Sequence, residues 1–190
     1  LLIEYFDRRI DYDPTSVDLL LPDNYKRLTY QAEAAIEGYE KLIKYNGVFL
    51  ADVVGLGKTI IASIIAKKFV FENGYHSKIL IVFPPAIEDN WRKTINDFNI
   101  RNNCSFISTG SLHKVLDNDI LDYPNADEYD LIIIDEAHKF RNDTSQMYEK
   151  LQRITKTDRK IPGVDGDVKK KVMLLTATPH RGRKDTFKKL

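Results

Sequence analysis

Apolar residues along the chain follow two patterns, short continuous runs and longer stretches with helical spacing. The runs are Val48 to Ala51, Lys78 to Phe83, Asn103 to Ser108, Tyr129 to Ile134 and Val172 to Leu175. Runs of this length are typical of strands that are buried on both faces, as in a parallel sheet. Five buried strands are therefore expected.

Between the runs, apolar positions recur every three or four residues, which is typical of amphipathic helices. We expect helices over 25–45, 58–71, 86–98 and 144–155, and others starting at Leu112 and Arg181. Strands that alternate with helices predict an α/β fold, a right-handed, mainly parallel sheet with helices on both faces. Ligands of such sheets bind at the carboxyl ends of the strands.

The segment Asp52 to Thr59, DVVGLGKT, joins the first strand to a helix and has the parts of a phosphate-binding loop. Gly55 and Gly57 lack Cβ atoms, so the backbone can curl and aim N–H groups at anionic oxygens. Lys58 can then reach the β- and γ-phosphates, and the Thr59 hydroxyl can coordinate Mg²⁺. Asp52 stands where the general pattern has Gly, so a plain strand-to-helix turn with a solvated lysine remains an alternative.

A second chemical centre follows the fourth strand, at Asp135-Glu136-Ala137-His138. A carboxylate at the end of a buried strand beside a phosphate loop is where Mg²⁺ needs a protein contact, and Asp135 fits. Glu136 would project the other way from an extended backbone and could deprotonate the attacking water. A salt-bridge role is the alternative, although two adjacent buried carboxylates are costly to ionise without a cation.

Three further strand ends carry candidate residues. Pro84-Pro85 leads into a helical stretch with Asn90 and Trp91, where a core role for Trp91 is favoured over ligand contact. Thr109-Gly110-Ser111 could hold a backbone phosphate or only cap the helix at Leu112. Thr176 and Thr178 could relay hydrogen bonds from the carboxylate motif. Gln31, ahead of the first strand, offers the donor and acceptor that reading adenine requires.

Composition bounds the class of protein. With 190 residues and 43% hydrophobic content, the chain can bury one well-formed core, so a single domain is expected. The net charge of +1 conceals acidic stretches at 1–23 and 117–130 and a basic one at 169–190, so any anion-binding face is local. Cys104, the only cysteine, excludes an intramolecular disulfide and a cysteine-rich zinc site. No apolar run approaches the roughly 18 residues of a membrane span, so no membrane partner is expected.

Taken together, the motifs resemble the first RecA-like lobe of superfamily-two helicase-like ATPases, closest to the Swi/Snf-type double-stranded DNA translocases. The resemblance covers about Arg27 to Arg183, and the matching stretches are RLTYQ, ADVVGLGKT, ILIVFPPAIEDNW, LIIIDEAHKFRN and LLTATPHR. Asp at the head of the phosphate loop is common in this branch. Val53, Val54 and Ala177 depart from its usual residues.

The resemblance implies a RecA-like P-loop NTPase fold, ATP and Mg²⁺ as ligands, and a role for each motif. Lys58 and Glu136 would be catalytic, with Glu136 as general base; Thr59 and Asp135 would hold Mg²⁺; His138, Thr176 and Thr178 would couple the site to DNA and to a second lobe. ATP would be bound by Gln31, Asp52, Gly55, Leu56, Gly57, Lys58 and Thr59. One DNA strand would pass along Pro84, Pro85, Asn90, Trp91, Thr109 and Gly110.

The resulting expectation is the motor lobe of a nucleic-acid-dependent ATPase, with duplex DNA and a second RecA-like lobe as partners. We expect residues 1–23 to be a connector, 24–190 to be the lobe, and 156–171 to be a mobile loop. The second lobe is absent from the chain, so the chain is expected to be a piece of a larger intracellular protein, cytoplasmic or, in a bacterium, nucleoid-associated. An RNA-acting or strand-separating helicase, a P-loop ATPase without nucleic acid, and a regulatory lobe without turnover are the alternatives.

Overall fold

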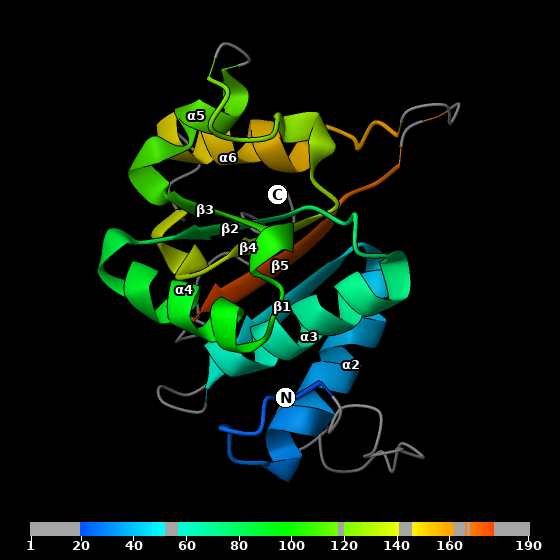
Figure 1. Ribbon diagram of the computed structural model, residues 1–190. Coiled ribbons are helices and arrows are strands. Elements are labelled where there is room, and N and C mark those ends of the chain that lie inside the picture. The colour runs from blue at the N-terminus through cyan, green and yellow to red at the C-terminus, as the bar shows by residue number, and fades with distance from the viewer. Residues whose placement is uncertain are drawn as a thin grey trace.

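The computed structural model describes residues 20–51, 57–117, 120–140, 146–161, 166 and 168–176. A five-stranded sheet lies between two layers of helices (Figure 1). All four strand pairs are parallel, in the order β1-β5-β4-β2-β3. The strands are β1 (Gly47–Ala51), β2 (Ile79–Phe83), β3 (Cys104–Ser108), β4 (Leu131–Ile134) and β5 (Lys171–Thr176). The predicted α/β fold with a parallel sheet is confirmed.

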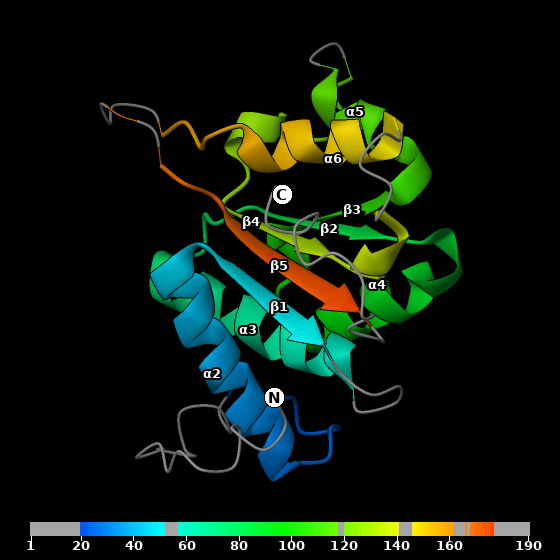
Figure 2. The same ribbon diagram turned by 180° about the vertical axis from the view of Figure 1, so that it is seen from behind.

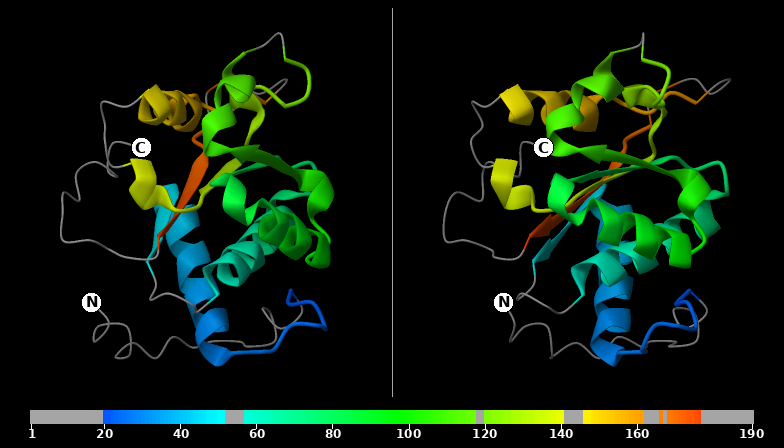
Figure 3. Two further views of the ribbon diagram at one scale, coloured as in Figure 1. Left: turned by 90° about the vertical axis from the view of Figure 1, so that its left-hand side faces the viewer. Right: turned by 60° about the vertical axis from the view of Figure 1, so that its left-hand side comes forward.

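Three helices cover one face of the sheet and two cover the other (Figures 1 and 2). The first layer holds α2 (Thr29–Tyr45), α3 (Lys58–Asn73) and α4 (Glu88–Asp97). The second holds α5 (His113–Leu116) and α6 (Gln146–Lys156). The two views of Figure 3 show these layers from the side. Short 3₁₀ turns complete the described chain: η1 (Pro85–Ile87), η2 (Arg101–Asn103), η3 (Thr109–Ser111), η4 (Ala126–Glu128) and η5 (Ala137–Phe140).

The central strands bury side chains on both faces, which explains their continuous apolar sequence. In β2, Ile79, Ile81 and Phe83 join the core under α3 and α4, whereas Leu80 and Val82 join the core under α5 and α6. Successive strand residues point to opposite faces, so a strand covered on both sides needs apolar residues at every position. β4 is buried at all four positions for the same reason.

Gly38 lets α2 approach its neighbours closely. A Cβ atom at this position would lie 2.9 Å from Cδ1 of Ile65 on α3 and 3.4 Å from Cδ2 of Leu50 on β1. A glycine inside a helix costs about 1 kcal/mol relative to alanine. Here it allows α2 to pack closely against α3 and β1, and this packing also sets the place of Gln31 in the first turn of α2.

Two predicted helices differ in the structure. The stretch expected over 86–98 is divided, because Ile87 leaves helical angles (φ −115°, ψ 12°) after the proline-initiated turn η1, and α4 begins at Glu88. The helix expected at Leu112 is the four-residue α5. Its predicted cap is wrong, because no side chain caps α5; Ser108 Oγ donates to Ser111 Oγ (3.1 Å) instead.

The described part of 156–171 is tied to the body of the protein. Arg159 forms an antiparallel bridge with Val168, and its Nε donates to Oδ1 of Asp130 at 2.8 Å. Buried Lys170 donates to the carbonyl oxygens of Ala126 and Ile154, the latter at 3.0 Å. The mobility of this loop stays a prediction. Most of the connector at 1–23 and the helix from Arg181 lie outside the described residues.

Within the described ranges, no helix has the length and apolar character needed to cross a membrane.

Candidate nucleotide-binding site

The predicted site residues gather at the carboxyl ends of the strands. β5 lies between β1 and β4, so the carboxyl ends of β1 and β4 flank that of β5 (Figure 2). In register, Ala51 at the end of β1 pairs with Thr176 at the end of β5, and Ile134 at the end of β4 pairs with Leu174. The strand that precedes the phosphate loop and the strand that precedes the carboxylate motif therefore end at the same edge of the sheet, one strand apart.

The start of α3 is built to face an anion. Gly57 has φ +85°, a left-handed conformation that favours glycine, and its carbonyl accepts from the N–H groups of Ile60 (2.9 Å) and Ile61 (3.1 Å). No side chain caps this helix start. An uncapped helix N-terminus directs N–H groups and a partial positive charge at anionic oxygens. Asp52, Gly55 and Leu56 lie outside the described residues.

Gln31 reaches this turn from the first turn of α2. Its side chain is buried, and a Cβ atom at Gly57 would lie 2.4 Å from its Nε2. The Gln31 amide therefore lies against the backbone of the phosphate loop, and the missing Cβ of Gly57 leaves room for it. The same amide lies 3.4 Å from the Tyr30 hydroxyl. Gln31, which is predicted to contact adenine, thus lies beside Gly57 of the phosphate loop. The roles of both residues remain predictions.

Asp135 is buried, and hydrogen bonds hold both of its carboxylate oxygens. The indole N–H of Trp91 donates to Oδ2 (2.9 Å), and the backbone N–H of Glu136 donates to Oδ1 (2.7 Å). Burial raises the pKa of Asp135 above its usual value, and the Glu136 charge adds to the rise. The two hydrogen bonds and the Lys58 ammonium oppose that rise in pKa. Lys58 and Asp135, far apart in sequence, therefore lie close enough for their charges to interact.

Glu136 differs from its predicted geometry. Its backbone is left-handed (φ +52°) and not extended, because β4 ends at Ile134 and the chain turns into η5. The turn directs the carboxylate to His138, whose Nδ1 lies 3.0 Å from Glu136 Oε2. The same nitrogen lies 3.3 Å from Oγ1 of Thr176. Residues from two predicted motifs thus meet at one ring nitrogen, while Thr178 lies outside the described residues.

The predicted DNA path divides into buried and exposed residues. Pro85, Asn90 and Gly110 are exposed and Thr109 is half-buried. Pro84 is buried and Trp91 is fully buried, so the prediction that these two residues contact DNA directly is wrong for this conformation. The favoured core role of Trp91 is confirmed, with an addition that the sequence did not indicate: its N–H is bonded to Asp135. Nothing in the spacing of residues 91 and 135 signals that bond.

The donor set fits Mg²⁺ bound together with a nucleotide. Thr59 at the start of α3 offers a hydroxyl and Asp135 offers a carboxylate, and Mg²⁺ prefers such oxygen ligands. Among the residues that the structure describes, no cluster of three or more His, Cys, Asp or Glu could hold a metal without help. Mg²⁺ is usually bound through one or two protein oxygens plus substrate phosphates, which agrees with this arrangement.

Comparisons with known proteins identify the family of the chain. The family model described as "Type III restriction enzyme, res subunit" matches residues 24–181. The uncharacterised ATP-dependent helicase YqhH of Bacillus subtilis is 31% identical over 91% of the chain, which spans 30% of that protein. The RNA polymerase-associated protein RapA of Yersinia enterocolitica is 30% identical over 75% of the chain, and 16% of RapA is covered.

A solved structure shows the same fold. The SWI2/SNF2 ATPase core of Sulfolobus solfataricus, determined in complex with double-stranded DNA, matches with a TM-score of 0.59 and 20% identity. The match covers 85% of this chain and 34% of that protein. The chain therefore spans about a third or less of each of these proteins.

Proposed function

The chain belongs to the family described as "Type III restriction enzyme, res subunit", whose domain is the amino-terminal lobe of superfamily-two helicases, and we propose that it is the ATP-binding motor lobe of a duplex-DNA translocase or remodeller. One observation carries the ATPase part. Lys58 at the start of α3 and Asp135 after β4 lie close enough for their charges to interact, and β1 and β4, which precede them, flank β5 in the sheet. Such a meeting of cation, helix N-terminus and carboxylate is suited to a metal-bound triphosphate.

Each residue then has a task in phosphoryl transfer. Lys58 and the N–H groups of α3 would bind the β- and γ-phosphates, and Thr59 and Asp135 would hold Mg²⁺. When bound, Mg²⁺ would supply positive charge to the phosphate oxygens. Glu136 accepts a proton from the attacking water. His138 orients the Glu136 carboxylate, and because Thr176 meets the same Nδ1, the two partners compete for one ring nitrogen.

Duplex DNA is proposed as the substrate because of the similar proteins. RapA is named as an RNA polymerase-associated protein, and the SWI2/SNF2 core was determined with double-stranded DNA. The exposed side of η1 and α4, with Pro85 and Asn90, and the exposed Gly110 follow strands β2 and β3, at the same end of the sheet as the nucleotide site. A strand-separating helicase is the second candidate, favoured by the name of YqhH.

Hydrolysis is expected to need a second RecA-like lobe in the same protein. Transition-state charge in such enzymes is stabilised by an arginine finger, which typically accelerates hydrolysis by about 10³ to 10⁵. The resemblance implies that these arginines come from that lobe. We infer that the 190-residue chain alone binds ATP weakly and hydrolyses it slowly or not at all.

The test compares ATP hydrolysis by the full-length protein without nucleic acid and with duplex DNA, single-stranded DNA or RNA. We expect duplex DNA to stimulate turnover most, with the 190-residue chain as a slow control in every arm. Equal rates in all arms would contradict the proposal and favour an ATPase without a nucleic-acid substrate. A strand-displacement assay separates the helicase candidate, since a translocase leaves a plain duplex paired. Robust DNA-stimulated turnover by the 190-residue chain would contradict the need for a second lobe.

A further inference from the structure

The buried indole N–H of Trp91 has the predicted metal ligand Asp135 as its hydrogen-bond partner. The indole is completely buried on α4, and its N–H points at Oδ2 of Asp135 at 2.9 Å. Because the backbone N–H of Glu136 holds Oδ1 at 2.7 Å, the carboxylate cannot rotate without losing a hydrogen bond. Hydrogen bonds to an ionised acceptor away from water are among the stronger ones in proteins. Trp91 thus fixes the orientation of the predicted metal ligand.

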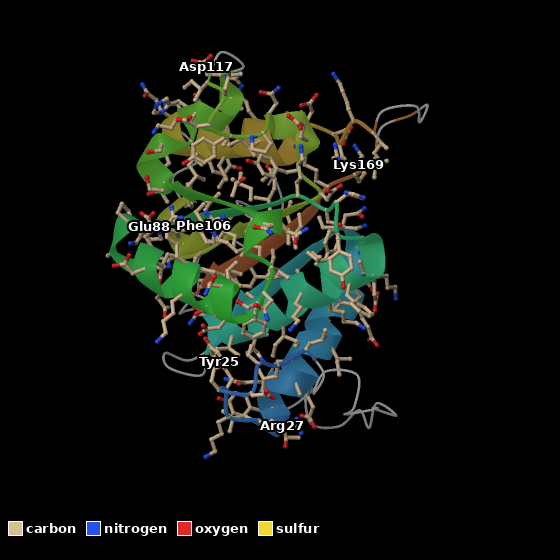
Figure 4. All side chains as sticks on the ribbon, in the orientation of Figure 1. Tyr25, Arg27, Glu88, Phe106, Asp117 and Lys169 are labelled. Atoms are coloured by element: carbon tan, nitrogen blue, oxygen red, sulfur yellow. The ribbon has the colours of Figure 1, made fainter. Side chains whose placement is uncertain are left out.

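The position of the indole is set by α4, which is held near both of its ends. Arg92 pairs with Glu88 (2.7 Å), and its guanidinium lies 4.8 Å from the centre of the Phe106 ring on β3. Toward the other end of the helix, the Tyr25 hydroxyl donates to Oδ2 of Asp97 at 2.9 Å. Glu88 of α4 and two residues outside this helix, Phe106 and Tyr25, are labelled in Figure 4. These contacts bring the Trp91 ring to Asp135 in one fixed place.

We propose that Trp91 is a positioning residue for ATP hydrolysis, which holds the Asp135 carboxylate ready for Mg²⁺ and makes the metal site depend on the position of α4. The proposal rests on the proposed function. The first turn of α4 carries exposed Asn90 on its surface and Trp91 on its buried side. A ligand that shifts the exposed side of α4 would therefore be sensed at Asp135 through one hydrogen bond.

The test measures Mg²⁺-dependent nucleotide binding to the full-length protein. A fluorescent ADP analogue is titrated at a series of Mg²⁺ concentrations and in EDTA, which gives the Mg²⁺ concentration for half-maximal affinity gain. Trp91→Phe removes the N–H. A second variant places β-(3-benzothienyl)alanine at position 91, which keeps the ring volume and replaces the N–H by sulfur. Ile95→Val, on the buried side of the same helix and without a bond to Asp135, is the matched packing control.

Loss of a residue that orients a metal ligand typically costs about 10-fold to 100-fold in metal affinity. We expect both Trp91 variants to need about that much more Mg²⁺, with unchanged affinity in EDTA and with kcat largely restored by excess Mg²⁺. Ile95→Val is expected to retain the wild-type Mg²⁺ requirement. If Trp91→Phe does not fold, the benzothienyl variant alone tests whether the N–H sets the Mg²⁺ requirement.

Two results would overturn the proposal, and they are distinguishable. If the wild-type protein binds nucleotide with Mg²⁺ while the thienyl variant needs no more Mg²⁺ than the wild type, the role of Trp91 is wrong and the proposed function stands. If the wild-type protein shows no Mg²⁺-dependent nucleotide binding, the proposed function itself fails, and the role of Trp91 fails with it.

Discussion

At the scale of single residues, Asp135 and Glu136 are neighbours with opposite surroundings. Asp135 is buried, and both of its oxygens are held by hydrogen bonds. Glu136 turns away through a left-handed backbone to a half-buried place beside His138. A non-glycine residue in this conformation costs on the order of 1 kcal/mol, which the surrounding structure must offset. Different surroundings suit different tasks, a fixed metal ligand and a proton acceptor in contact with water.

Substitution separates binding from chemistry at this site. In the full-length protein, Glu136→Gln keeps the shape and the turn but cannot accept a proton, so kcat should fall by about 10² to 10⁴ with nucleotide affinity retained. Lys58→Ala removes the cation that binds phosphates, so nucleotide affinity should fall instead. Steady-state ATPase rates and nucleotide titrations measure the two effects. Ordinary turnover by the Gln variant would remove Glu136 from its role as general base.

At the scale of elements, the amount that the sequence predicts depends on how local the cause is. β2 and β4 were predictable because a strand covered on both faces needs apolar residues throughout. The start of α3 was predictable because Gly57 and Lys58 carry a local signal. The contacts of Trp91 with Asp135 and of Gln31 with Gly57 were not predictable, because packing between distant segments creates them. The left-handed turn at Glu136 was not predictable either, because it depends on where β4 ends.

The segment before β5 gives a prediction for pH dependence. Lys170 is buried, and burial lowers its pKa from 10.5 to about 8, although nearby Asp127 and Asp158 oppose this change. Between these two pKa values the unfolded chain binds more protons than the folded one, so this lysine makes folding stability rise with pH. Below about pH 8 both states are protonated, and its contribution is constant.

Urea unfolding of the 190-residue chain, followed by the fluorescence of its single tryptophan, measures this effect. From pH 7.5 to 9.5 the wild type should gain about 2 kcal/mol of unfolding free energy relative to Lys170→Met. The variant has no amine at this position, so the difference between the two proteins isolates Lys170 from other titrating groups. A constant difference across this pH range would show that the folded state does not perturb the Lys170 pKa.

At the scale of the whole molecule, the lobe places four motifs along one edge of a sheet. β1, β4 and β5 lead to the phosphate loop, the carboxylate motif and Thr176, and β2 leads to the turn before α4. Trp91 connects α4 to Asp135, and His138 connects Glu136 to Thr176. In the described part of the chain, hydrogen bonds thus connect both α4 and β5 to the candidate nucleotide site.

We propose that the Lys58-Thr59 turn and Asp135 share one Mg²⁺-bound nucleotide. A double-mutant cycle tests this sharing. Nucleotide affinity with Mg²⁺ and in EDTA is measured for the full-length wild type, Thr59→Val, Asp135→Asn and the double variant. If both residues hold one ion, each single substitution should remove most of the affinity gained from Mg²⁺, and the double substitution should remove little more. Losses that simply multiply, as for independent sites, would contradict the account.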